Sequence, residues 1–261
     1  EKRYDVMKKY QTYIAIGSLL SLMVVLITYG LMQDTQHLNP LESPNGQHWL
    51  GTDQLGRDFL VRLIVGSLVT LSLTGIVILL SVCMGLIFGL IAGIERRWLD
   101  QIIMFVADML LAIPSFIIAL VILSLVSNSM IGLILALTIG WIGRYLRYFR
   151  NLTRDIQKRP FVQYARLSGN STFKTTVTHV IPHLLSSIFA LVTADFGKMM
   201  LSISGLAFLG LGIKPPTPEL GTILFDGKSY FNGAPWLFFF PGVLLGGFAL
   251  LCQIINKKIT Q

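Results

Sequence analysis

The chain consists of long apolar runs separated by short polar and charged segments. A helix needs about 20 apolar residues to cross the hydrocarbon core of a bilayer, where every backbone polar group must be paired within the protein. Six runs satisfy this length requirement, so we predict an all-α integral membrane protein with six transmembrane helices. The predicted spans cover residues 13–32, 63–94, 102–127, 130–149, 181–204 and 235–256.

The composition agrees with this pattern, because 53% of the residues are hydrophobic and only 13% are charged. So few polar groups cannot coat a surface that faces water, and the bilayer must act as the missing solvent. Cys83 and Cys252 stand far apart in apolar runs without metal-ligand spacing, so we expect two buried thiols with no redox role.

The distribution of basic residues predicts the orientation of the chain. Lys and Arg are enriched in the cytoplasmic loops of membrane proteins. With both termini in the cytoplasm, sixteen of the 21 basic residues fall in cytoplasmic segments, and four, Arg57, Arg62, Lys214 and Lys228, fall outside. We therefore predict an N-in, C-in topology. The basic residues lie between apolar runs, so we interpret the net charge of +8 as a consequence of the membrane topology. We predict no nucleic-acid partner.

The longest cytoplasmic loop, about residues 150–182, contains a short predicted helix from Pro160 to Gly169. Proline suits the first turn of a helix, and glycine suits the position just past its end. Helical spacing predicts one face formed by Phe161, Tyr164, Ala165 and Ser168. Such a helix could enter a groove on a partner or lie on the lipid surface, and physical reasoning alone leaves both alternatives open.

The same segment resembles a known coupling loop. The sequence from Gln163 to Gly169, QYARLSG, followed by Ile181-Pro182, is similar to the loop through which permeases of binding-protein-dependent ABC importers contact their ATPase. Gln163 and Tyr164 depart from the glutamate and alanine usual in that family, which removes a possible salt bridge. The resemblance implies an ATPase-coupling role for Phe161, Gln163, Tyr164, Ala165, Arg166 and Gly169.

Two further motifs narrow the resemblance to one family. The segments HWLGTDQLGRD at 48–58 and AFLGLGIKPPTPELG at 207–221 resemble signatures of dipeptide, oligopeptide and nickel permeases, specifically the second of their two paired subunits. This resemblance covers about residues 48–241. It implies the type I importer permease fold, a paired permease, two ATP-binding subunits, an extracytoplasmic substrate-binding protein and the bacterial cytoplasmic membrane.

The resemblance also implies that this chain binds no cofactor and catalyses no reaction. Because a GxxxxGK[ST] phosphate loop does not occur in the sequence, ATP and Mg²⁺ would be bound by partner subunits. No internal repeat or linker divides the chain, so we predict a single permease domain over residues 1–261, with outer loops at about 33–62 and 205–234.

The motif before the second span invites two interpretations. Its polar and flexible residues suit a tight turn, and a contact with the binding protein is the less favoured alternative. The residues concerned are Gly51, Asp53, Gly56, Arg57 and Asp58. After the fifth span, prolines at 215, 216 and 218 forbid a continuous helix, and we interpret this segment as an outer gate or cap.

Acids inside the predicted spans are candidates for the translocation path, because charged groups in a membrane face protein or water. Asp108 and Asp195 lie at similar predicted depths, and Lys198 follows Asp195 at a spacing that allows the two to pair. His179 and His183 have metal-ligand spacing, but Pro182 stands between them and no third ligand is apparent, so we predict no metal site.

Short matches at 166–169 and 195–201 are nearer to nickel permeases than to peptide permeases, so the leading cargo is nickel or a related transition metal as a small chelate. Di- or oligopeptides are the alternative. A secondary carrier is a distant alternative, since such carriers show inverted repeats and need no coupling loop. An intramembrane protease would need a base beside its serine, and the spans offer no suitable histidine.

Overall fold

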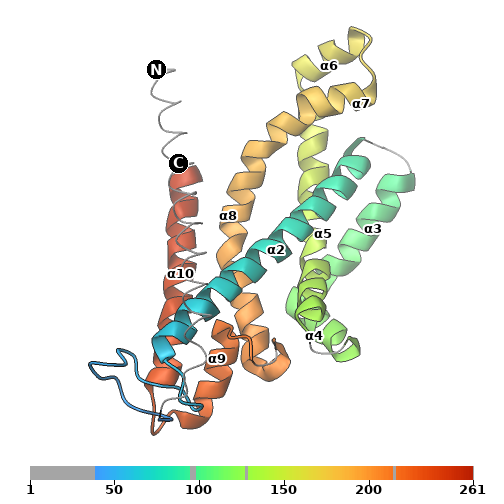
Figure 1. The fold of residues 1–261 in the computed structure, drawn as a ribbon. Helices are drawn as coiled ribbons and strands as arrows, with labels where there is room; N and C mark the ends of the chain where they lie inside the picture. The colour runs from blue at the N-terminus through green and yellow to red at the C-terminus, as the bar shows by residue number, and fades with distance from the viewer. Residues whose placement is uncertain (1–38, 95–97, 127–128, 214–215, 261) are drawn as a thin grey trace, which may run out of the picture. The chain divides into compact units, whose positions relative to one another are not determined.

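The computed structural model describes residues 39–94, 98–126, 129–213 and 216–260, and the regular elements in these segments are helices (Figure 1). The long helices are α2 (Phe59–Ile94), α3 (Trp98–Ala112), α5 (Met130–Gln157), α8 (Ile181–Leu206) and α10 (Trp236–Thr260). The shorter elements are α4 (Ser115–Leu125), α6 (Pro160–Leu167), α7 (Thr172–Thr175), η1 (Thr176–Val180), η2 (Ala207–Leu211), α9 (Leu220–Gly227) and η3 (Lys228–Tyr230).

Four helices of the described segments are long and apolar enough to cross a bilayer, and a bent pair could supply a fifth span. The four apolar segments are Phe59–Ile94, Met130–Gln157, Ser187–Leu211 and Trp236–Lys258. They coincide with predicted spans two, four, five and six. The first predicted span, 13–32, lies outside the described residues, so the count of six spans and the N-in, C-in orientation stay predictions.

The third predicted span, 102–127, is not one straight helix. It breaks between α3 and α4, whose axes differ in direction by 92°. Pro114 stands at the break with φ −52° and ψ 129°, an extended conformation that ends one helix before the next begins. Proline offers no N–H to continue the helix and disfavours helical backbone at the residue before it.

The described residues divide into two compact units. The first unit contains residues 39–70 and 216–244, and the second contains the described residues of 71–213 and 245–260.

Three glycines at four-residue intervals bring α2 against α5 inside the second unit. An added Cβ would lie 2.5 Å from the Cβ of Tyr145 at Gly85 and 2.8 Å from the Cβ of Phe149 at Gly89, and Gly93 continues the series. Larger residues would therefore force the two helices apart. Small residues at this spacing allow close backbone approach between helices in lipid, where apolar burial no longer drives association.

The two cysteines differ from each other in their surroundings. Cys83 is exposed on α2, whereas Cys252 on α10 is half-buried. The prediction that both thiols are buried is therefore wrong for Cys83. An apolar helix in a bilayer can direct such a side chain at lipid as readily as at protein, because the two surroundings are similarly apolar.

Candidate functional site

Helix α6 begins and ends where its sequence predicts. Pro160 occupies the first turn, where its missing N–H costs no helical hydrogen bond. At the other end Gly169 has φ +84°, and its N–H donates to the Arg166 carbonyl at 3.0 Å. The Asn170 N–H donates to the Ala165 carbonyl at 3.3 Å, which completes a Schellman motif. The motif ends the helix sharply and leaves α6 as one compact segment.

One side of α6 is anchored in the second unit. Val162 is fully buried in an apolar cluster with Ile156 of α5, Val180 of η1 and Leu184 of α8. Phe161 packs against this cluster, and its ring stacks on that of His183 with centroids 4.7 Å apart. Phe161 therefore faces the protein, and the prediction that it shares an exposed face with Tyr164 is wrong.

The opposite side of the α6–α7 hairpin, which Figure 1 shows beyond the ends of α5 and α8, is exposed and partly apolar. Tyr164 is 69% exposed, Leu167 is 83% exposed and Phe173 is 79% exposed. Gln163 and Arg166 are exposed as well, while Ala165 is half-buried. The sequence analysis did not single out Leu167 and Phe173 as part of this surface. Apolar residues in an otherwise basic loop could have identified them.

The hairpin joins α8 through a wide π-helical turn, η1. The Ile181 N–H donates to the Thr176 carbonyl, five residues back. The next residue, Pro182, cannot donate a helical hydrogen bond, and its ring would crowd the preceding turn of an α-helix. A single π turn relieves this conflict while the chain remains helical.

The two histidines of the predicted pair are in contact through the backbone of one of them. His183 Nδ1 lies 2.9 Å from the carbonyl oxygen of His179, so one ring nitrogen is used by the backbone. Within the described segments, no group of three or more His, Cys, Asp or Glu side chains has a geometry that could bind a metal.

A stripe of arginines on α5 pairs with the acids of α3 and α8. Arg144 Nη2 lies 2.9 Å from Oδ1 of Asp195, whose side chain is completely buried. The predicted partner Lys198 is farther away, with Nζ 3.8 Å from the same oxygen. The two cations are 44% and 62% exposed, so the buried acid is balanced by charges that extend toward the surface of this unit.

Three further arginines of the stripe pair with α3. Arg147 forms an ion pair with Asp108, and both side chains are exposed. Nearer the end of α5, Arg150 donates to both carboxylate oxygens of Asp100 at 2.9 Å, and Arg154 adds a third bond at 2.7 Å. Sequence reasoning missed these partners, although the three- and four-residue spacing of the arginines marks one helix face.

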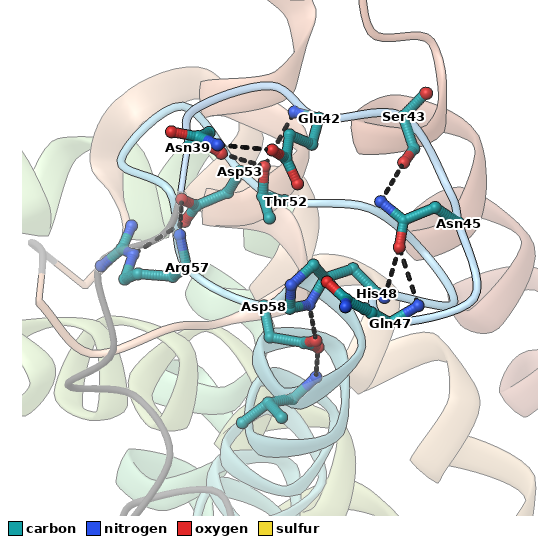
Figure 2. A network of polar contacts seen from close by, with 11 residues as sticks. Asn39, Glu42, Ser43, Asn45, Gln47, His48, Thr52, Asp53, Arg57 and Asp58 are labelled. Atoms are coloured by element: carbon teal, nitrogen blue, oxygen red, sulfur yellow. Dashed lines mark hydrogen bonds and ion pairs between the residues drawn. The ribbon is translucent and has the colours of Figure 1, made fainter.

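In the first unit, the loop 39–58 is organised around the buried carboxylate of Asp53, shown in Figure 2. It accepts hydrogen bonds from the backbone N–H groups of Leu55 and Arg57 at 2.8 and 2.9 Å. The Nε atoms of Arg57 and Arg62 lie 2.7 and 3.1 Å from its other oxygen. Four donors thus surround this acid.

Three other residues of the motif in this loop, Gly51, Gly56 and Asp58, have structural roles. Gly51 and Gly56 have φ values of +76° and +73°, which side chains rarely adopt, so the predicted tight turn is confirmed. Asp58 accepts a hydrogen bond from the Val61 N–H at 3.1 Å at the start of α2, and its other oxygen lies 2.9 Å from Nδ1 of His48 (Figure 2).

Two acids of α9 and its N-terminus also belong to the first unit. Glu219 is fully buried, accepts from the Thr222 N–H at 2.9 Å and accepts from the Thr70 hydroxyl at 3.0 Å. Burial raises the pKa of Asp226 above its ordinary value, although the nearby guanidinium groups of Arg62 and Arg57 act in the opposite direction. Neither acid was singled out from the sequence.

Several apolar helices, intramembrane ion pairs and an exposed apolar hairpin flanked by basic residues define a multi-pass helical membrane protein. Residues 85–261 match the family model described as "Binding-protein-dependent transport system inner membrane component", so the chain belongs to this family of ABC importer permeases.

Relatives with named cargoes are similar over most of the chain. The nickel transport system permease protein NikC of Escherichia coli K12 is 35% identical over 88% of this chain and 84% of its own length. The dipeptide transport system permease proteins DppC of Haemophilus influenzae and Alkalihalophilus pseudofirmus are 33% and 31% identical. These matches cover 84% and 86% of this chain, and 75% and 74% of the relatives.

The chain is therefore a permease subunit of an ABC importer of the dipeptide and nickel type. Members of this family are membrane components that are typically non-catalytic. The family implies a location in the bacterial cytoplasmic membrane and work beside a paired permease, ATPase subunits and a substrate-binding protein.

Proposed function

We propose that this chain forms half of the translocation path for nickel or a related transition metal, carried as a small organic chelate. The observation that carries the proposal is the 35% identity to a nickel permease over 88% of the chain. Import of di- or oligopeptides is the second candidate, favoured by the 31% and 33% identities to dipeptide permeases.

Uptake of radiolabelled nickel and of a labelled dipeptide tests the cargo. Cells that express the cognate binding protein are compared with and without this gene. Loss of nickel uptake alone is the expected result. Loss of dipeptide uptake alone would replace the metal with a peptide as the cargo, and loss of neither would refute both.

The α6–α7 hairpin is proposed as the ATPase-coupling element. Its exposed apolar residues, Tyr164, Leu167 and Phe173, suit a groove on a partner protein, because solvent-facing apolar clusters commonly mark interaction sites. On its other side, Val162 is buried against α5 and α8, so a push on the hairpin would be passed to both helices. Gln163, Ala165, Arg166 and Gly169 complete the proposed coupling segment, and Phe161 anchors it.

A charge on the exposed face tests the coupling role. Leu167→Asp and Tyr164→Asp are expected to abolish uptake and ATPase association while the permease still inserts. The matched control is Tyr230→Asp, which changes an exposed tyrosine of the other unit, outside the loop 39–58. Normal uptake by Leu167→Asp would refute the coupling role.

For the path itself, we propose that Asp108, Asp195 and Lys198 lie along the route of the cargo, on spans three and five. Their support is chemical: Asp108 and Lys198 are exposed in the single chain, yet they belong to apolar segments. Charged groups at such positions require water or a partner protein. ATP-driven closure of the ATPase pair would rock these spans between inward- and outward-open states.

The loop 39–58 is proposed to face the substrate-binding protein. Gly51, Asp53, Gly56, Arg57 and Asp58 build its shape, and the exposed Trp49 and Leu55 would supply contact surface. Aromatic residues are frequent anchors at protein interfaces.

A further inference from the structure

Helix α3 is joined to α5 by a buried carboxylate in its first turn. Asp100 belongs to that turn, and its side chain is buried within the second unit. Its Oδ1 accepts a hydrogen bond from Nε of Arg150 at 2.9 Å. Its Oδ2 accepts from Nη2 of Arg150 at 2.9 Å and from Nη2 of Arg154 at 2.7 Å. We call these three residues the α3–α5 clamp.

The geometry of the clamp leaves little freedom to either helix. A guanidinium that donates two parallel hydrogen bonds to one carboxylate fixes both the distance and the orientation of the two groups. The third nitrogen of the Arg150 guanidinium, Nη1, donates to Oδ1 of Asn151 at 3.2 Å. All three nitrogens of this arginine are therefore engaged, and its guanidinium is held in one orientation.

A second ion pair between the same two helices is of a different kind. Arg147 and Asp108 are both exposed and share a single contact. Exposed ion pairs contribute little free energy, because water and salt screen them and both side chains must be immobilised. The α3–α5 clamp therefore fixes the position of α3 along α5 more firmly than this pair does.

The clamp lies directly before the α6–α7 hairpin along the chain. Arg154 belongs to the last turn of α5, which ends at Gln157, and α6 begins at Pro160. In the same turn, Ile156 packs in the apolar cluster that contains Val162 of α6. A force on the hairpin therefore acts on the turn of α5 that carries the clamp.

On its other side the clamp leads into the broken third span. Helix α3 has 15 residues and is therefore about 22 Å long. Packed helices of this kind commonly shift as rigid bodies. A displacement of the first turn of α3 would then also move Asp108, a proposed path residue, and the break at Pro114.

From these observations we infer that Asp100 is a positioning residue of the transport cycle, because the α3–α5 clamp makes α3 follow the end of α5 when the hairpin moves. This inference rests on the proposed coupling role of the hairpin and extends it from α5 and α8 to α3. Asp100 contacts neither cargo nor nucleotide in this scheme and acts through its two arginines.

The first test measures uptake per ATP hydrolysed by Asp100→Asn. The transporter is assembled in vesicles with its partner permease, ATPase subunits and loaded binding protein, and nickel–histidine chelate and a dipeptide serve as separate probes. The substitution keeps the size of the side chain and removes its charge. Loss of one hydrogen bond between charged groups shifts an equilibrium about tenfold, so we expect the ratio to fall about tenfold for the cargo that is carried.

The matched control is Asp155→Asn, which weakens an exposed pair with Lys158 on the same helix and should keep the ratio unchanged. A merely structural role of Asp100 would lower the amount of assembled transporter, but each assembled complex would still import the same amount per ATP. An unchanged ratio for Asp100→Asn therefore overturns the inference.

The second test follows the movement itself and needs no cargo. Spin labels are attached to Trp98→Cys on α3 and Lys158→Cys at the end of α5, both at exposed positions, after Cys83 and Cys252 are replaced by alanine. With Asp100 present, the distance between the labels should be the same with and without ATP. In Asp100→Asn it should differ between these states. A distance that changes in both proteins, or in neither, overturns the inference.

If Asp100→Asn does not assemble, Arg154→Gln removes one of the three hydrogen bonds and leaves the pair between Arg150 and Asp100. It is measured in the same way, and an unchanged ratio again overturns the inference. Failure of the proposed coupling role gives a different result, because Leu167→Asp would then import cargo normally.

Discussion

Two fully buried aspartates, one in each unit, are stabilised in opposite ways. Asp53 is surrounded by two backbone N–H groups and two buried arginines of its own unit. Asp195 is balanced by Arg144 and Lys198, whose side chains are 44% and 62% exposed. A buried carboxylate whose donors are all buried as well is held in one arrangement. A buried carboxylate whose charged partners are exposed can exchange one partner for another. We expect the first acid to maintain a loop and the second to tolerate motion.

The largest effect is expected from Asp53→Ala. Arg57 and Arg62 would lose the carboxylate that both contact, and removing one partner of a buried ion pair typically costs about 3–5 kcal/mol. Thermal denaturation and the membrane yield of the assembled transporter measure the change. The control is Asp155→Ala, which breaks an exposed pair with Lys158 and should cost at most about 1 kcal/mol. Equal melting temperatures for the two variants would contradict the proposal that Asp53 and its buried partners maintain the loop.

A smaller loss is expected from Arg144→Gln. Asp195 would lose its nearer partner, but the exposed Lys198 can approach and compensate in part, so we expect about 1–3 kcal/mol. The same melting experiment measures stability, and uptake assays measure function. Destabilisation as large as that of Asp53→Ala would show that the two acids are held equally rigidly.

Lys198→Gln should change stability very little. Its Nζ lies 3.8 Å from Asp195 and the side chain is mostly exposed, the arrangement in which ion pairs contribute about 0–1 kcal/mol. Melting close to that of the unmodified complex, with altered uptake, is the expected pattern. A loss larger than that of Arg144→Gln would reverse the ranking of the two partners.

The smallest effect, with the opposite sign, is expected from Asp226→Asn. Burial raises the pKa of this carboxyl, so its charged form is disfavoured in the folded unit. The stability it contributes is complete below the unfolded pKa and is lost as the pH rises through the raised folded value. The variant should therefore melt like the unmodified complex in acid and slightly higher near neutral pH. A difference that does not change with pH would contradict this.

Local chemistry made parts of the molecule predictable. The ends of α6 follow from Pro160 and Gly169, and the turn in the loop 39–58 follows from Gly51 and Gly56, because each constraint acts within a few residues. Four predicted spans coincide with apolar helices, because the length of an apolar run is enough to predict a membrane-spanning helix.

What sequence reasoning missed depends on tertiary contacts. Lys198 was chosen for Asp195 because it is three residues away, but the closer partner, Arg144, comes from another helix. Phe161 was placed on the exposed face because helical spacing gives relative positions, and the direction of each face depends on what packs there. The third span was predicted as one segment, 102–127, and the 92° bend between α3 and α4 was not predicted.

The π turn at Thr176–Val180 makes the protein sensitive to the deletion of a single residue. It contains one residue more than an α-helical turn would need, so deleting a single codon there could restore regular helix without breaking the chain. Each α-helical residue advances the backbone by about 100°. Such a deletion would rotate the α6–α7 hairpin by about a quarter turn against α8 and separate Phe161 from His183. We therefore expect the protein to tolerate amino-acid substitutions in this turn far better than insertions or deletions.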